Sequence, residues 1–171
     1  HVGGAVLLYK SPNLIDWQYL GPMIVDDSLL VDEMWECPNF FPLGDKFVLV
    51  VSVTSRAYTE YFIGEFRDEK FFPEVRRRLD YSGYFYAPQT LLDDRGRRIL
   101  IGWIGEGRSV EKDKLAGWSG LQSVPRVLTV RGDGFLGVEP VPELHRLRET
   151  HHAIEDVQLR PDIPYETAIE S

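Results

Sequence analysis

Residues 35–53 read WECPNFFPLGDKFVLVVSV, and this stretch decides the fold because its pattern occurs twice. Residues 85–104 read FYAPQTLLDDRGRRILIGWI and repeat the same order. An aromatic residue is followed by a polar residue or Tyr, a small residue and Pro, and then by a strand, a turn and a second strand. The two prolines, Pro38 and Pro88, are 50 residues apart. Periods of roughly 40 to 50 residues in β-rich chains are typical of propeller blades, with about four strands to a blade.

The rest of the chain before residue 140 also favours β-structure. Short runs rich in β-forming residues occupy 5–9, 47–53, 59–66, 98–104 and 127–130, with turn residues at 44–46, 93–96 and 131–134. No stretch before residue 140 sustains a helical period, so no helix is predicted there. A weaker third copy of the repeat starts at 124–126 and turns at 132–134. We predict an all-β chain that forms part, about three blades, of a propeller; at this point a β-sandwich remains the alternative.

The composition of the sequence changes after residue 139. Four prolines interrupt a polar stretch, at positions 140, 142, 161 and 164. We therefore expect a partial propeller over residues 1–140, a linker over 141–164, and the start of a further strand-containing module at 165–171. The chain also begins without Met and reads as if it starts inside a domain, so an upstream leader stays open.

Composition excludes several classes of partner. The chain has 171 residues, 43% of them hydrophobic, and a formal net charge of −8, which argues against nucleic acid or an anionic membrane surface as partner. The single cysteine, Cys37, allows neither an internal disulfide nor a cysteine zinc cluster, and the four histidines lie outside the repeat. We expect no metal and no cofactor. The compartment stays open, with the cytoplasm slightly favoured over secretion.

The repeat also predicts where a site would form. The innermost strand of a propeller blade lines the central funnel, so Glu36 and Tyr86, at equivalent positions, are expected to face one shared site. An apolar setting raises the pKa of a carboxyl group, which suits a general acid near neutral pH, and the alternative is a rim glutamate in a salt bridge. Asp80 is a further candidate, for hydrogen bonding to sugar hydroxyls, and the alternative is an aspartate that only supports a turn. Trp103 is a candidate for stacking on a ligand, and the alternative is a tryptophan of the core.

Five groups of residues, in the right order, resemble the motifs of glycoside hydrolase family 32, the invertases and fructan hydrolases. They are 35–41, 80–81 with 85–90, 98–103, 117–120 with 124–129, and 7–11 with 16–17. The resemblance implies a five-bladed propeller followed by a β-sandwich, and retaining hydrolysis of β-fructofuranosides. It implies that Glu36 is the catalytic acid/base. It places Trp35, Cys37, Asp80, Tyr86 and Trp103 among the substrate-binding residues.

This chain departs from the family pattern in two ways. Ser82 and Tyr84 stand where the family usually has Gly and often has Asp. The Asn-Asp-Pro-Asn motif that carries the nucleophile and the Arg-Asp-Pro motif do not occur in these 171 residues. We therefore expect a fragment of a β-fructofuranosidase acting on sucrose or fructo-oligosaccharides, inactive by itself, whose N-terminal blades come from the rest of the same protein. The alternatives are a carbohydrate-binding propeller without activity, a fructosyltransferase of the same superfamily, and a protein-interaction propeller of the kelch type.

Overall fold

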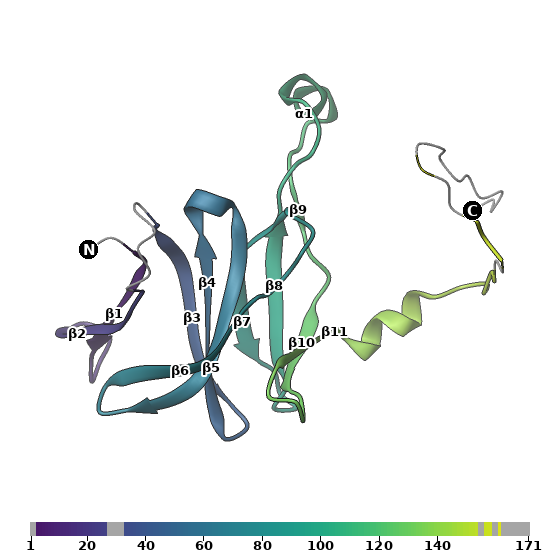
Figure 1. Cartoon of the computed structure of the whole chain (residues 1–171). Helices are drawn as coiled ribbons and strands as arrows, with labels where there is room; N and C mark the ends of the chain where they lie inside the picture. Colours follow the sequence, from purple (N-terminus) through teal and green to yellow (C-terminus); the bar gives the residue numbers. More distant parts are fainter. Residues whose placement is uncertain (1–2, 27–32, 154–155, 159–160, 162–171) are drawn as a thin grey trace. The chain divides into compact units, whose positions relative to one another are not determined.

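Three antiparallel sheets lie side by side in the computed structural model, which describes residues 3–26, 33–153, 156–158 and 161 (Figure 1). Residues up to Val141 form one compact unit, and a second unit begins at Pro142. The all-β class predicted from the sequence is confirmed. All three sheets belong to the first unit, and so does the candidate site described below.

Each of the two larger sheets is a meander whose strands follow chain order from one edge. The hairpin sheet contains β1 (Ala5–Lys10) and β2 (Gln18–Val25). The middle sheet has the order β3 (Trp35–Leu43), β4 (Lys46–Val53), β5 (Tyr58–Arg67) and β6 (Lys70–Arg78). The third sheet has the order β7 (Phe85–Leu92), β8 (Arg98–Ile104), β10 (Arg126–Val130) and β11 (Leu136–Pro140), and β9 (Leu121–Gln122) pairs with the end of β8.

The repeat predicted from the sequence corresponds to the first two strands of the middle and third sheets. β3 and β7 are the first strands of their sheets, and each leads through a predicted turn into β4 or β8. Gly44 and Gly96 sit in these turns with φ of 64° and 75°, a left-handed conformation that glycine adopts without steric cost. The turn at residues 131–134 likewise joins β10 to β11.

The third copy of the repeat was a wrong interpretation. Residues 126–140 form β10 and β11, which are the outer two strands of the third sheet and not the start of another one. The sequence pattern misled because an outer hairpin of a blade shows the same alternation of strand and turn as an inner one. The described residues thus contain two four-strand meanders and one separate hairpin sheet.

The prediction that no helix occurs before residue 140 was also wrong. α1 (Val110–Ala116) lies between β8 and β9, where Ser109 caps its start and Gly117, with φ of 77°, ends it. Seven residues make only two turns, too few for an apolar period to appear in the sequence. Two short 3₁₀ helices, η1 (Thr54–Arg56) and η2 (Pro142–Leu147), complete the described elements. The strand expected from residue 165 lies outside the described residues.

The core consists of two layers, one on each face of the middle sheet. Val48 and Val50 of β4 face the third sheet, whereas Leu49 and Val51 face the hairpin sheet. All four are completely buried, which explains why β4 reads as a continuous apolar run and not as an alternating one. Fully burying such a side chain contributes roughly 1.5–3 kcal/mol. The middle sheet is therefore held firmly against both of its neighbours.

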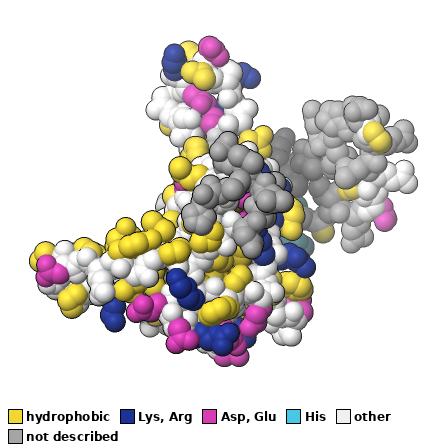
Figure 2. All heavy atoms as spheres, turned by 60° about the vertical axis from the view of Figure 1, so that its left-hand side comes forward, with side chains coloured by type: hydrophobic (Ala, Val, Ile, Leu, Met, Phe, Trp, Pro, Cys, Tyr) yellow, Lys and Arg dark blue, Asp and Glu magenta, His cyan; other side chains and the backbone are white. Residues whose placement is uncertain are grey.

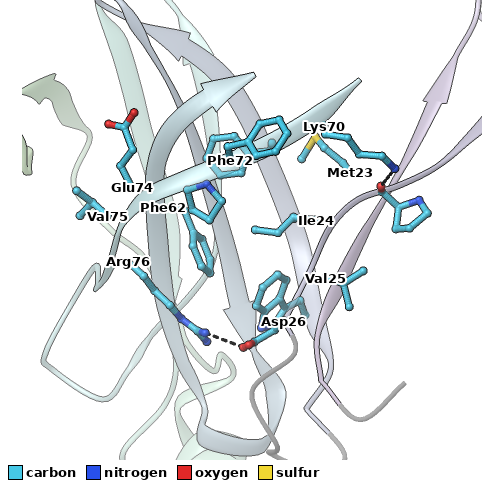
Figure 3. A pocket seen from close by; sticks show the side chains of 14 residues that line it. Met23, Ile24, Val25, Asp26, Phe62, Lys70, Phe72, Glu74, Val75 and Arg76 are labelled. Atoms are coloured by element: carbon cyan, nitrogen blue, oxygen red, sulfur yellow. Dashed lines mark hydrogen bonds and ion pairs between the residues drawn. The ribbon is translucent and has the colours of Figure 1, made fainter. Parts of the chain in front are cut away.

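A single arginine connects the hairpin sheet to the middle sheet beside a pocket of about 550 Å³ (Figure 3). Arg76 of β6 donates to Asp26 Oδ2 at 2.6 Å and to Glu60 Oε1 at 2.8 Å, and its guanidinium lies over the ring of Phe62. Burial lowers the pKa of Arg76, but the hydrogen bonds to Glu60 and Asp26 raise it by more. The net effect is a raised pKa, so the guanidinium stays charged. Lys70 Nζ donates to the carbonyl of Pro22 across the same pocket.

Hydrophobic side chains also remain on the surface of the first unit. Figure 2 shows them gathered on the side that carries the hairpin sheet, and Leu7, Tyr9 and Tyr19 of that sheet are each about half exposed. A two-stranded sheet has little stability of its own and normally pairs with further strands. No helix of the described residues is long and apolar enough to cross a membrane.

Candidate active site

Glu36 and Tyr86 meet where the middle and third sheets approach each other. Glu36 is the second residue of β3, Tyr86 is the second residue of β7, and both are half-buried. The Tyr86 hydroxyl donates a hydrogen bond of 2.9 Å to Glu36 Oε2. The two repeat copies therefore bring a carboxyl group and a phenol into one place, although 50 residues separate them in the sequence.

A bulge in each strand aims these two side chains. The pairing register shifts between Glu36 and Asn39 in β3, and between Tyr86 and Gln89 in β7. The proline at the fourth position of the repeat has no N–H to donate to a ladder, which favours such a break in pairing. Bulges of this kind re-aim side chains and are common next to active sites.

Asn39 joins the two bulges, and sequence reasoning missed it. Its buried amide nitrogen donates to the carbonyls of Pro88, at 2.9 Å, and Cys37, at 3.0 Å. Its side-chain oxygen accepts from the backbone N–H of Thr90 at 2.9 Å. A polar residue in the aromatic run 39–41 was the available signal, because a buried amide side chain requires several partners.

The environment of Tyr86 keeps its hydroxyl protonated. Burial and the hydrogen bond to Glu36 raise the pKa of Tyr86 to about 12. Both causes act against the phenolate, since burial disfavours a charge and the nearby carboxylate repels it. Tyr86 is therefore a neutral hydrogen-bond donor to Glu36 throughout the physiological pH range.

Trp103 lies directly opposite Tyr86 on β8 and forms one wall of a small pocket. Its side chain is 51% exposed, and the pocket, of about 340 Å³, is also lined by Tyr84 and Tyr86. The remaining lining residues are Thr54, Ala57, Gly83, Gly105 and Glu106. Aromatic walls with a few polar groups suit a ligand that has apolar faces and hydroxyl edges, such as a sugar ring.

The pocket rim includes an ion pair that the sequence did not indicate. Glu106 accepts from Arg108 Nη2 at 2.6 Å, and the Arg108 guanidinium lies 4.1 Å from the ring of Trp118. The hydrogen bonds from Arg108 and from the N–H of Gly120 outweigh burial and lower the pKa of Glu106 to about 2. Glu106 is thus ionised at neutral pH and is not suited to donate a proton.

Asp80 is held by its own partners. Its Oδ2 accepts from Arg126 Nη1 at 2.8 Å and its Oδ1 accepts from the N–H of Ser82 at 2.9 Å. Burial raises the pKa of Asp80, but the hydrogen bonds from Ser82 and Arg126 lower it by more, and the net effect is a lowered pKa. The structure thus shows Asp80 anchoring the β6–β7 loop to β10, and the sugar contact implied by the resemblance stays a prediction.

Trp35 and Cys37 flank Glu36 in the sequence but lie differently from it in the fold. Successive residues of a strand point to opposite faces, and Trp35 points into the core between the middle and hairpin sheets, where its ring is 5.2 Å from that of Phe62. Trp35 is thus a core residue of this structure, and the substrate contact implied by the resemblance stays a prediction. Cys37 is half-buried, carries a free thiol, and its carbonyl accepts from Asn39.

The described residues contain no group of three or more His, Cys, Asp or Glu side chains placed to hold a metal ion. Glu36 accepts from the Tyr86 phenol, and the indole of Trp103 lies on the strand opposite Tyr86. This set can orient a carboxyl group and pack against a neutral ligand, which are the requirements of acid/base chemistry on a carbohydrate.

Known proteins share both this sequence and this fold. Sucrose-6-phosphate hydrolase of Vibrio alginolyticus is 38% identical over 161 residues, covering 85% of this chain and 33% of that protein. The cell wall isozyme of beta-fructofuranosidase from Pisum sativum is 35% identical over 175 residues, covering 85% and 31%. The crystal structure of fructan 1-exohydrolase IIa from Cichorium intybus matches with a TM-score of 0.75 at 29% identity, covering 85% of this chain and 32% of that one.

These relatives are named as hydrolases of sucrose phosphate, fructofuranosides or fructans, and the fold of this chain is similar to that of the fructan 1-exohydrolase. The profile described as glycosyl hydrolases family 32 N-terminal domain matches residues 2–140. The chain belongs to glycosyl hydrolase family 32, which confirms the family inferred from the motifs. It spans about a third of the length of the curated relatives named above.

Proposed function

We propose that this chain supplies the general acid/base, Glu36, to the active site of a retaining β-fructofuranosidase that hydrolyses sucrose or fructo-oligosaccharides. The hydrogen bond of 2.9 Å between Tyr86 and Glu36 carries the proposal, because it orients a carboxyl group at the meeting point of two sheets. The family supports the reaction class. A variant of the Cichorium intybus enzyme in complex with 1-kestose, 29% identical to this chain, supports the substrate class.

The chemistry requires two carboxyl groups, and Glu36 is one of them. In the first step Glu36 donates its proton to the glycosidic oxygen as the bond from that oxygen to the anomeric carbon breaks, and the second carboxylate attacks the anomeric carbon. In the second step Glu36, now ionised, takes a proton from water, which displaces the enzyme carboxylate. Tyr86 donates to one oxygen of Glu36 and leaves the other free for this proton transfer.

The second carboxylate belongs, in this proposal, to residues outside these 171. The Asn-Asp-Pro-Asn motif does not occur in the sequence, and the chain covers about a third of its relatives. The half-exposed apolar residues of the hairpin sheet, such as Leu7, suit a surface that further strands would cover. In the full-length protein these strands would complete a five-bladed propeller, with a β-sandwich after residue 164.

Trp103 and Tyr84 would form the aromatic walls against which the sugar packs. Trp103 is half exposed opposite Tyr86, the hydrogen-bond partner of Glu36, and both aromatic side chains line the same pocket. In the same proposal Cys37 and Asp80 are substrate-binding residues, as the resemblance implies, and Asp80 is held in place by Arg126.

The test is Glu36→Gln in the full-length protein. Loss of acid assistance is typically worth ~10²–10⁴ in rate, and we expect hydrolysis of sucrose to fall by at least that factor. The control is Glu65→Gln, which removes a half-exposed carboxylate on β5. Turnover of Glu36→Gln within a few-fold of wild type would refute the proposal.

Three further measurements test the proposal and separate the alternatives. The 171-residue chain purified alone should release no fructose, and turnover by it would mean that it holds its own nucleophile. Product analysis at high sucrose concentration distinguishes hydrolysis from fructosyl transfer. Calorimetric binding of sucrose by a full-length protein that cleaves nothing would indicate a carbohydrate-binding propeller, and absence of binding would indicate an interaction propeller.

A further inference from the structure

Three polar side chains form a row across the middle sheet at the end of its apolar face. Glu36 on β3 pairs with Ser52 on β4, and Ser52 pairs with Thr59 on β5. Residues directly opposite each other in antiparallel strands point to the same face. The polar row, Glu36, Ser52 and Thr59, therefore faces the third sheet, beside the apolar layer that contains Val50 and Tyr61.

All three members of the polar row bond to one tripeptide of β7. Glu36 Oε2 accepts from the Tyr86 hydroxyl at 2.9 Å, Ser52 Oγ accepts from the N–H of Ala87 at 3.0 Å, and Thr59 Oγ1 donates to the carbonyl of Phe85 at 3.2 Å. The two peptide groups that flank Tyr86 are thus both fixed, one through its oxygen and the other through its nitrogen.

The burial of the two hydroxyl groups shows that these bonds replace missing backbone pairing. Ser52 and Thr59 are both completely buried, and the ladder between β7 and β8 has no paired residue between Tyr86 and Gln89. The N–H of Ala87 would be left without a ladder partner at this bulge, and a buried N–H without a partner is costly. Ser52 supplies the acceptor from the neighbouring sheet.

We propose that Ser52 and Thr59 are positioning residues that hold the Tyr86 hydroxyl on Glu36. This inference rests on the proposed role of Glu36 as the general acid/base. Tyr86 extends from a backbone with a bulge and a left-handed residue after it, so the direction of its side chain depends on how this backbone is fixed. Neither hydroxyl reaches the substrate in this view; each acts through Tyr86.

The experiment measures steady-state hydrolysis of sucrose by the full-length protein carrying Ser52→Ala or Thr59→Val, substitutions that remove a hydroxyl with little change of volume. We expect kcat to fall roughly 10- to 100-fold in each, because displacement of a catalytic group by about 1 Å can cost 10²-fold, while KM stays within about threefold. Thr59→Ser keeps the hydroxyl and should retain at least half of the wild-type kcat.

A double-mutant cycle with Tyr86→Phe separates positioning from general structural support. If Ser52 acts through the Tyr86 hydroxyl, Ser52→Ala should lower kcat less than threefold in a Tyr86→Phe background. Equal losses in both backgrounds would overturn the inference. The matched control is Tyr61→Phe, which removes another buried hydroxyl that links the same two sheets by accepting from the N–H of Leu136. It should lower thermal stability without lowering kcat.

The remaining outcomes are also decisive. Wild-type kcat in both Ser52→Ala and Thr59→Val would overturn this inference while an inactive Glu36→Gln variant would still support the proposed function. Wild-type turnover in Glu36→Gln would remove the proposed function and this inference together. If Ser52→Ala fails to fold, as judged by circular dichroism, the comparison of Thr59→Val with Thr59→Ser decides, since a kcat that is equal in these two variants contradicts a role for the hydroxyl.

Discussion

Cys37 and Ala87 occupy equivalent positions in two neighbouring sheets, and both have a left-handed backbone, with φ of 49° and 45°. Neither is glycine, so each conformation costs of order 1–2 kcal/mol. Strain of this kind persists where the surrounding structure fixes it, and it is concentrated at functional sites. Here each strained residue directly follows a side chain of the candidate catalytic pair, Glu36 or Tyr86.

Removing the Tyr86 hydroxyl should impair catalysis more than binding. Tyr86→Phe deletes the hydrogen bond of 2.9 Å to Glu36 Oε2 and leaves the ring in place. We expect kcat for sucrose to fall about 10- to 100-fold, since positioned acid/base assistance is typically worth ~10²–10⁴ in total and Glu36 itself remains. Steady-state kinetics on the full-length protein measure this.

Tyr19→Phe is the control for that experiment. Tyr19 is half exposed on β2 in the hairpin sheet, and its loss should change neither kcat nor KM. An unchanged kcat in Tyr86→Phe would contradict the proposed pairing.

A methyl group at position 120 should disturb the aromatic pocket. A Cβ added to Gly120 would lie 2.3 Å from Trp103 Nε1, and the backbone there has φ of 74°. We expect Gly120→Ala to displace the indole and to raise KM for sucrose at least threefold. Tryptophan fluorescence and steady-state kinetics report the two effects.

Gly117→Ala provides a matched comparison for the strain at position 120. Gly117 has nearly the same φ, 77°, but a Cβ there meets nothing within 4 Å. Both variants should lose about 1–2 kcal/mol of stability from the left-handed backbone. Only Gly120→Ala should change KM. An equal rise of KM in the two variants would show that Trp103 does not shape the substrate pocket.

Arg76→Met should destabilise the contact between the hairpin and middle sheets. It leaves the carboxylates of Asp26 and Glu60, whose side chains are 7% and 5% exposed, without this cation. Losing one partner of a buried pair typically costs about 3–5 kcal/mol, measurable as the free energy of unfolding in urea. Lys46→Met, which breaks a more exposed pair with Glu74, should destabilise the protein much less than Arg76→Met does.

The cost of Arg76→Met should depend on pH. Burial, partly offset by Arg76, already raises the pKa of Glu60 above its ordinary value in the folded protein. Glu60 therefore favours folding most at low pH, and this contribution is lost as pH rises through the raised pKa. Without Arg76 the pKa rises further, so the destabilisation should be largest at neutral pH and should shrink towards about pH 4.3. A loss that is constant with pH would exclude this explanation.

Asp80→Asn should reveal a carboxylate with the opposite pH dependence. Burial raises the pKa of Asp80, but the hydrogen bonds from Ser82 and Arg126 lower it by more. The carboxylate therefore stabilises the folded protein at pH values above the unfolded pKa. This stabilisation is lost as pH falls through the pKa of the folded protein. We expect a loss of about 1–2 kcal/mol at pH 7 that diminishes below about pH 3.9. Asp133→Asn, in an exposed pair with Arg131, should stay within about 0.5 kcal/mol of wild type. A loss at pH 7 equal to that of Asp133→Asn would contradict the anchoring role of Asp80.

Much of the fold could be predicted because the repeat is local. The stretches that begin at Trp35 and Phe85 carry their own turn, apolar run and proline, and each forms the first two strands of its sheet. The outer strands β10 and β11 were assigned to a separate blade, because a strand pattern does not indicate which neighbour the strand pairs with. The helix α1 was too short to leave a period.

The sequence by itself determined the β class, the family and the two residues, Glu36 and Tyr86, at matching points of a repeat. Only the tertiary structure decided that they touch, that Trp35 turns into the core, and that Ser52 and Thr59 fix the backbone around Tyr86. The physical reason is that these contacts join separate sheets. Ser52 interrupts the apolar run of β4, and the sequence gives no reason for it. The reason is the N–H of Ala87 in the bulge of β7, which donates to the Ser52 hydroxyl from another sheet.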